Sequence, residues 1–248
     1  MRDLRPLSSR VHAWLRESIL DLTLLPGAPI IESDVAARFD ASRTPVREAL
    51  LRLCDEELVE IRPQRGTYVA RLSLARIESA MFIRQAIECA VVRRLAAHAR
   101  GGALAGVLSA IVRRQGEAVD AGDVTAGLDA DTEFHRTLVE ASGLPDVWSV
   151  VARARELHHR IRAIAVPTLN TGPQAVADHR RVVAALKRGD PERADRALCL
   201  HLSRNVALAR TIAARHPAFF VPEREVAERF TGPASGAGRS PANSSRPG

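Results

Sequence analysis

The sequence predicts a mainly α-helical protein built from an N-terminal winged helix-turn-helix and an all-α antiparallel helical bundle. Three observations predict this fold class. Alternating apolar and polar residues, which indicate strands, occur in LVEIRPQRGTYVARL, on both sides of a turn at 63–66. Helical periodicity precedes and follows this hairpin. Only 4% of the residues are aromatic, and the alanine- and leucine-rich composition favours helices over sheets.

Three helices precede the hairpin. Residues 8–23 place a first apolar stripe on one helical face, and the Pro-Gly pair at 26–27 ends it. Residues 32–39 form a second short helix, and ASRTPVREALLRL at 41–53 forms the third. The first stripe consists of Val11, Leu15, Ile19 and Leu22, and the third helix carries Val46, Ala49, Leu50 and Leu53 at the same kind of spacing.

The third helix carries cations at its start. We expect Thr44 to cap it, because Pro45 suits the first helical position, where no N–H is needed. Arg43 and Arg47 lie close together there and off the apolar stripe. Cations at a helix N-terminus oppose the macrodipole, so a partner outside the chain is expected to supply negative charge.

Double-stranded DNA is the expected partner, since the second helix of a helix-turn-helix enters the major groove with its N-terminal residues on the bases. We expect contacts from the third helix and the end of the second, and minor-groove or backbone contacts from the hairpin tip. The predicted DNA-binding residues are Arg38, Arg43, Thr44, Arg47, Arg65, Gly66 and Thr67. The alternative is that these arginines only solvate a surface. Residues 1–71 hold 11 arginines and 11 acidic residues, which disfavours an architectural or nonspecific DNA binder, because nonspecific affinity needs net positive charge.

The rest of the chain adds compartment and domain predictions. Cys54, Cys89 and Cys199 are scattered without CxxC spacing, so we expect reduced, buried thiols in a cytoplasmic protein. No signal peptide and no apolar run of about 20 residues is present, so no membrane partner is expected. Net charge is +7, compatible with a polyanionic partner.

Six helical segments are expected between 73 and about 215, separated by Gly- and Pro-containing breaks at 101–102, 121–123, 142–145, 170–173 and 189–191. A last short helix is expected at 219–230, before a low-complexity tail. The predicted domains are 1–72 for DNA binding, 73–230 for metal and effector binding and for dimerisation, and 231–248 as a disordered tail.

Polar residues interrupt the buried stripes of the second part. Asp131 and His135 lie at i and i+4, and His179, His201 and Asn205 occupy inward positions on two later helices. A buried carboxylate is costly unless it is paired or binds a metal. Three imidazoles and one carboxylate suit Zn²⁺, Ni²⁺ or Mn²⁺. The alternative is that each histidine is a satisfied core residue, and His158 is a weaker candidate ligand.

The segment LRESILDLTLLPGAPIIESDVAARFDASRTPVREALLRLCDEELVEIRPQRGTYV resembles the DNA-binding domain of the GntR transcription regulators. Two residues depart from the family pattern, since Asp40 and Glu57 replace glycines at turns. DTEFHRTLVEASG, followed by DHRRVVAALKRGDPERADRALCLHL, resembles the FCD ligand-binding domain of the FadR-type branch. Together the resemblance covers residues 8 to about 214.

The resemblance implies specific roles. It assigns Asp131, His135, His179 and His201 to a divalent metal, with an organic or sugar acid as effector at that centre. Arg84 corresponds to an arginine that recurs in the family and could bind the effector carboxylate; a structural ion pair with Glu88 at i+4 is the alternative. Asn205 is a second candidate effector residue.

The predicted function is a homodimeric repressor on a pseudo-palindromic operator, with operator affinity modulated by a metabolite. The alternative is a metal-dependent hydrolase or lyase that uses the Asp/His centre. No HExxH motif and no obvious general base accompany that centre. The protein is therefore not expected to be an enzyme.

Overall fold

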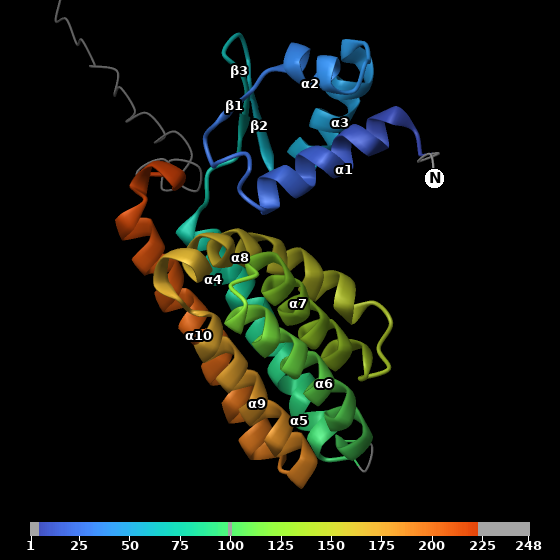
Figure 1. The fold of residues 1–248 in the computed structure, drawn as a ribbon, viewed down its shortest axis with the longest axis vertical. Helices are drawn as coiled ribbons and strands as arrows, with labels where there is room; N and C mark the ends of the chain where they lie inside the picture. The colour runs from blue at the N-terminus through green and yellow to red at the C-terminus, as the bar shows by residue number, and fades with distance from the viewer. Residues whose placement is uncertain (1–4, 99–100, 223–248) are drawn as a thin grey trace, which may run out of the picture.

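The computed structural model describes residues 5–98 and 101–222 and confirms the predicted fold class. A small sheet and three helices form one end of the molecule, and a bundle of long helices forms the other (Figure 1). Each part has its own cluster of buried apolar side chains. In the described ranges, no helix combines the length and hydrophobicity needed to cross a bilayer.

The N-terminal part runs in the order of a winged helix-turn-helix. Helix α1 (Leu7–Leu20) is followed by strand β1 (Pro29–Ile30), helices α2 (Glu32–Arg38) and α3 (Arg43–Asp55), and strands β2 (Val59–Arg62) and β3 (Gly66–Val69). The strands form an antiparallel sheet in the order β1-β3-β2. The predicted stripe of α1 is buried up to Ile19, but Leu22 lies beyond the helix end and packs against the core of the bundle.

Two turns keep the backbone conformation that favours glycine, although Asp40 and Glu57 stand there. Asp40 has φ 48° and Glu57 has φ 60°, both in the left-handed region that side chains disfavour. The start of α3 differs from the prediction. Ser42 occupies the N-cap position without a side-chain capping bond, whereas Thr44 is the second helical residue. Pro45 is therefore the third helical residue rather than the first. Proline is still tolerated there, because the backbone amides of the whole first turn have no partner within the helix.

The C-terminal part contains the six helical segments that the breaks predict. The first is a continuous run of α4 (Leu74–Arg84), a π-helical turn η1 (Gln85–Cys89) and α5 (Ala90–Ala96). The others are α6 (Gly101–Asp120), α7 (Val124–Glu140), α8 (Val147–Leu169), α9 (Gly172–Arg188) and α10 (Pro191–Arg215). Neighbouring helices pack lengthwise, with α6 against α7 and α9, and α10 against α9 and α5 (Figure 1).

Helix α8 and the end of the described chain contact the N-terminal part and the linker. Arg16 of α1 pairs with Glu156 of α8, and the Arg160 guanidinium donates to the backbone carbonyl of Ala70 at 2.7 Å. Leu72 forms a parallel bridge with Phe220, just after the 3-10 turn η2 (Pro217–Phe219). Of the short helix predicted at 219–230, residues 219–222 are not α-helical. Residues 223–230 and the predicted disordered tail 231–248 lie outside the described residues.

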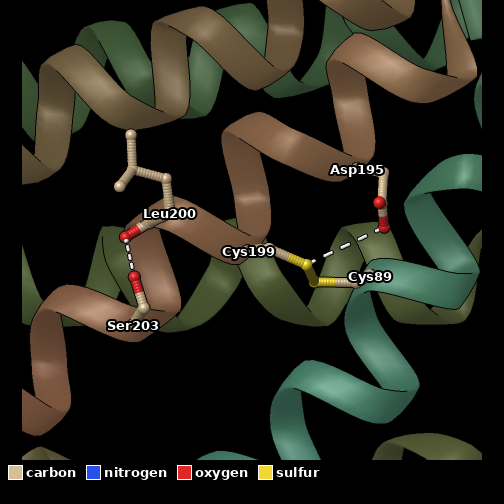
Figure 2. Close-up of a disulfide and its surroundings, with 5 residues drawn as sticks. All are labelled: Cys89, Asp195, Cys199, Leu200 and Ser203. Atoms are coloured by element: carbon tan, nitrogen blue, oxygen red, sulfur yellow. Dashed lines mark hydrogen bonds between the residues drawn. A yellow bond between two sulfur atoms is a disulfide. The ribbon is translucent and has the colours of Figure 1, made fainter.

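The cysteine prediction is wrong in two respects. Cys89 of η1 and Cys199 of α10 form a disulfide, with Cα atoms 6.0 Å apart (Figure 2). Cys54 is free but only half-buried, and Cys199 is half-buried as well. Packing of α10 against η1 brings together two positions 110 residues apart, a proximity that cysteine spacing in the sequence cannot show.

Candidate metal centre and DNA-binding surface

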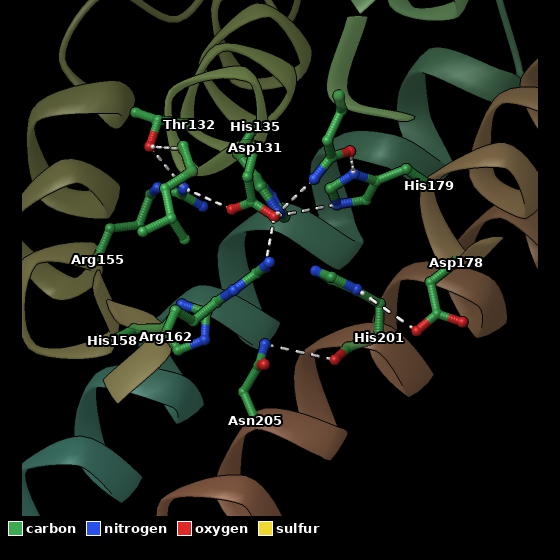
Figure 3. Close-up of polar contacts among 12 residues, drawn as sticks. Asp131, Thr132, His135, Arg155, His158, Arg162, Asp178, His179, His201 and Asn205 are labelled. Atoms are coloured by element: carbon green, nitrogen blue, oxygen red, sulfur yellow. Dashed lines mark hydrogen bonds and ion pairs between the residues drawn. The ribbon is translucent and has the colours of Figure 1, made fainter. Parts of the chain in front are cut away.

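Four predicted ligands meet inside the helical bundle. Asp131 and His135 come from α7, His179 from α9 and His201 from α10, and all four side chains are buried. Each offers a ligand atom within 4.8 Å of those of the others. They face one another across the space between these helices (Figure 3).

The orientation of His179 is fixed by Gln115 of α6. Its Nδ1 lies 2.7 Å from the side-chain oxygen of Gln115, and this oxygen can only accept a hydrogen bond. The proton is therefore on Nδ1, and the lone pair of Nε2 faces away from Gln115. No described residue hydrogen-bonds to that Nε2, although it is buried.

Carboxylates lie beside Nδ1 of the other two histidines, at different distances. His135 Nδ1 lies 2.5 Å from a Glu88 carboxylate oxygen, and His201 Nδ1 lies 3.6 Å from a carboxylate oxygen of Asp178. Within the described chain, His201 Nε2 also has no hydrogen-bond partner. Histidine ligands usually carry such an acceptor on the distal nitrogen, which fixes the tautomer and the ring direction. Unpaired buried nitrogens otherwise cost about 1–3 kcal/mol each.

The charge states also suit a metal. Burial lowers the pKa of His135 to about 3 and that of His179 well below its ordinary value, so both are neutral, the form that binds metals. Burial alone would raise the pKa of Asp131, but the guanidinium groups of Arg162 and Arg155 hold it well below its ordinary value. These groups donate to the two carboxylate oxygens at 2.6 and 3.0 Å. Asp131 is therefore an anion.

Three imidazole nitrogens and one carboxylate fit a divalent ion such as Zn²⁺, Ni²⁺ or Mn²⁺. Bonds of about 2.0–2.1 Å place any two ligands of one ion at most about 4.2 Å apart. The candidate ligand atoms lie within 4.8 Å of one another, so the four side chains must converge further, by rotation, to bind one ion.

Arg84 makes the structural ion pair rather than facing a free cavity. It is 0% exposed, its Nε lies 2.6 Å from Glu88, and a terminal nitrogen lies 2.8 Å from His158 Nδ1. Burial alone would raise the pKa of Glu88, but Arg84 and His135 hold it well below its ordinary value. His158 therefore lies next to the centre, outside the group of four.

Two cavities approach the cluster. One of about 310 Å³ is lined by Asp131, Arg155, His158 and Arg162, and it extends to Arg16 of α1. A smaller one of about 170 Å³ is lined by Asn205, His201 and Arg204. Arginines line both, so both suit an anionic ligand. Asn205 itself is buried and donates to the backbone carbonyl of His201 at 3.4 Å.

The predicted DNA-binding residues of the helices are exposed at one edge of the N-terminal part. Arg43 and Thr44 are exposed at the start of α3, and Arg47 is 64% exposed although its Nε pairs with Glu32 at 2.9 Å. The guanidinium of Arg38 lies 4.6 Å above the ring of Trp14. The start of α3 is thus open to a duplex.

The hairpin tip differs from the prediction at one of its three expected DNA-contacting residues. Arg65 and Gly66 are exposed, and Gly66 has φ 105°, which suits glycine. Thr67 is only 7% exposed, because it lies in the central strand on the same inward face as Val69. Its side chain is therefore not at the surface with the other predicted contacts.

Comparison with known proteins identifies the family of both parts of the chain. The bacterial regulatory proteins, gntR family, match residues 7–69, and the FCD domain matches residues 79–204. The chain is 30% identical over 219 residues to the HTH-type transcriptional repressor RspR of Escherichia coli, covering 88% of this chain and 96% of that protein. This chain belongs to the GntR family. Its relatives are transcription regulators, so the alternative of a metal hydrolase or lyase has no support among them.

Further members of the family extend the comparison. The probable D-xylose utilization operon transcriptional repressor of Paenarthrobacter nicotinovorans is 32% identical over 202 residues, which cover 79% of this chain and 86% of that one. A crystal structure of a putative GntR transcriptional regulator from Rhodococcus sp. RHA1 superposes with a TM-score of 0.69 at 25% identity, over 84% of this chain and 98% of that one.

Four residues around the centre of this GntR-family chain were not predicted. Gln115 and Asp178 orient histidines, and Arg155 and Arg162 hold Asp131. One signal was available in the sequence. Arg155, His158 and Arg162 share a face of α8, at i, i+3 and i+7, among apolar residues.

Proposed function

We propose that this GntR-family regulator is a repressor whose operator affinity changes when a small acid binds beside a divalent metal in the FCD domain. Asp131, His135, His179 and His201 would hold the metal. The observation that carries this proposal is a set of three buried imidazoles. His179 and His135 have a hydrogen-bond acceptor on Nδ1, and His201 has a carboxylate 3.6 Å from its Nδ1. Nε2 of His179 and of His201 has no hydrogen-bond partner among the described residues. Two relatives, RspR and the probable D-xylose utilization operon repressor, are described as repressors, which supports the sign of regulation.

Residues 1–72 would bind DNA and residues 73–230 would bind metal and effector and form a homodimer. Two copies would place two α3 helices on the half-sites of a pseudo-palindrome. We assign base contacts to Arg43, Thr44 and Arg47, since arginine pairs bidentately with guanine in the major groove. Arg38, Arg65 and Gly66 would contact the backbone or minor groove. A regulator of this kind acts in the cytoplasm, where the chromosome lies.

A divalent metal held by these four residues would supply a Lewis-acid site for a carboxylate, which needs a coordination number above four. The chain itself contributes positive charge to the cavity of about 310 Å³ that Arg155 and Arg162 line. Arg155 and Arg162 point their guanidinium groups at Asp131, and each has donors left for a second anion. The pKa of Arg155 is lowered by burial and by Arg84 to about 10, so it stays charged at neutral pH. An organic or sugar acid is the ligand class that matches this lining.

Helix α8 would carry the signal to the DNA-binding part. One face of it holds Arg155 and Arg162 at the centre, while Glu156 pairs with Arg16 and Arg160 binds the Ala70 carbonyl of the linker. If α8 can take two placements relative to the DNA-binding part, a ligand that binds one placement more tightly raises its population. Because half-site spacing is fixed by DNA geometry, such a shift alters operator affinity.

The direct test is a thermal-shift screen of organic and sugar acids, with and without a chelator. D-Xylose and its acid are included because the name of one relative refers to D-xylose utilization. The expected result is an acid that raises the melting temperature of the metal-loaded protein only. His179→Ala should abolish this shift, while His98→Ala, which changes an exposed histidine, should keep it. A shift that survives chelation and His179→Ala would contradict the proposal.

A further inference from the structure

We propose that Cys89 and Cys199 form a reversible thiol-modification site, oxidised and reduced by a small thiol/disulfide couple, whose state adjusts the metal centre. The structure shows the pair in its oxidised form (Figure 2). The Cα separation of 6.0 Å lies in the usual range for disulfides. The consequence for the metal rests on the proposed function, whereas the redox chemistry does not.

The bond joins two segments that support different candidate ligands. Cys89 closes the π-helical turn η1, directly after Glu88, whose carboxylate accepts from His135. Cys199 lies on α10, two residues before His201. The disulfide therefore ties the support of one imidazole to the helix that carries another.

Opening the bond releases this tie. A covalent bond holds the two sulfurs closer than two thiols can approach, so reduction leaves η1 and α10 free to separate slightly. Metal–ligand distances in a formed site lie within about 0.2 Å of their usual values. A small relative movement of Glu88 and His201 thus changes metal affinity without any change in the ligands themselves.

The surroundings of the sulfurs set the direction of attack. Cys199 is half-buried whereas Cys89 is buried, so a reducing thiolate reaches Cys199 first. It forms a mixed disulfide with Cys199 and releases the Cys89 thiolate. A second small thiol then attacks the mixed disulfide, releases Cys199 and leaves as the oxidised reagent. Two electrons pass from the two small thiols, and their two protons end on Cys89 and Cys199.

Asp195 lies close enough to favour the reduced state. Its carboxylate oxygen is 3.8 Å from Cys199 Sγ, across one turn of α10 (Figure 2). Only the thiol form of Cys199 has a hydrogen to donate to it. In a compartment rich in reducing thiols, disulfides are usually transient and sensing, which is the behaviour that this arrangement supports.

The test uses the full chain with Cys54→Ser, which leaves one possible intramolecular pair. The protein is equilibrated with reduced and oxidised glutathione at a series of ratios, quenched with acid and alkylated. Intact mass then reports the fraction in each state. The expected result is a reversible two-electron transition, absent in Cys89→Ser and in Cys199→Ser.

Zn²⁺ affinity and operator affinity are then measured for the oxidised and reduced forms. We expect the two forms to differ about fivefold or more in Zn²⁺ affinity, a common size for coupling between sites. The reduced form should match the Cys89→Ser/Cys199→Ser double variant.

Three results would overturn the inference: no disulfide at any glutathione ratio, oxidised and reduced forms with equal Zn²⁺ and operator affinities, or a second Zn²⁺ in the reduced form that the double variant lacks. If neither form binds Zn²⁺, the proposed metal centre fails. The inference then stands if the two forms differ in operator affinity and falls if they do not.

Discussion

Replacing Gln115 tests whether the support of a single imidazole controls the metal centre. Gln115 is 1% exposed, accepts from His179 Nδ1 at 2.7 Å and lies 3.4 Å from Asp131 through its amide nitrogen. Gln115→Met keeps the length and shape of the side chain but removes both polar groups. His179 then loses the acceptor that fixes its tautomer, and its Nε2 is no longer held toward the centre.

The size of the effect follows from this lost contact. Loss of an outer hydrogen-bond partner typically lowers metal affinity about 10–100-fold. At about 1.4 kcal/mol per factor of ten, this is roughly 1.4–2.8 kcal/mol of binding free energy. The free energy of unfolding of the metal-free protein should fall too, by about 1–3 kcal/mol, because a buried N–H loses its acceptor.

The assay is a competition titration against a chromophoric chelator, with urea unfolding as the separate measure of stability. Arg113→Ala is the matched control, because Arg113 lies on the same helix but is exposed and pairs only with Glu117 among the described residues. We expect this control to match the wild type in both measurements. Unchanged metal affinity in Gln115→Met would refute the idea that Gln115 orients His179 for a metal.

Four other predictions concern both parts of the chain. Arg47→Ala should weaken operator binding by about 1–3 kcal/mol and relax base preference at one position of each half-site, measured by anisotropy on operator and random DNA; an equal loss on both DNAs would make Arg47 a phosphate contact. His179→Ala should lower the metal content found by elemental analysis, and unchanged stoichiometry would remove it from the ligand set. Arg160→Met removes the donor to the Ala70 carbonyl, so the acid identified in the screen should change operator affinity less than it does in the wild type; an undiminished response would show that this contact does not transmit the signal. Burial lowers the pKa of His135 to about 3, so between pH 6.5 and 3 the unfolded chain binds a proton that the folded chain does not. The free energy of unfolding of the metal-free protein, measured by urea titration, should therefore fall as pH falls through that window. His135→Asn should flatten this dependence of stability on pH.

The local patterns of the sequence were enough to predict most of the fold. Apolar periodicity gave the helices, and alternation gave the hairpin, because both are set by neighbours within a few residues. Asp40 and Glu57 were recognised as turn positions because glycines belong there. Strand β1 was missed, since two residues carry no alternation. The start of α3 was displaced because several residues of SRTP suit a first turn.

The residues of the candidate site were likewise predicted only in part. The four proposed ligands could be named because each interrupts an apolar stripe, and the structure brings them within reach of one ion. Gln115 and Asp178 could not be named, because the partners of these polar side chains are set only when distant helices pack together. The same holds for Cys89 and Cys199, whose proximity depends on η1 and α10 lying side by side.

The most direct measurement is anomalous diffraction at the metal absorption edge from crystals of the metal-loaded protein. The expected result is one peak inside the bundle, bound by Nε2 of His135, His179 and His201 and by a carboxylate oxygen of Asp131. No peak there, a peak elsewhere, or ligation through Nδ1 would contradict the arrangement of acceptors on which the metal centre is argued.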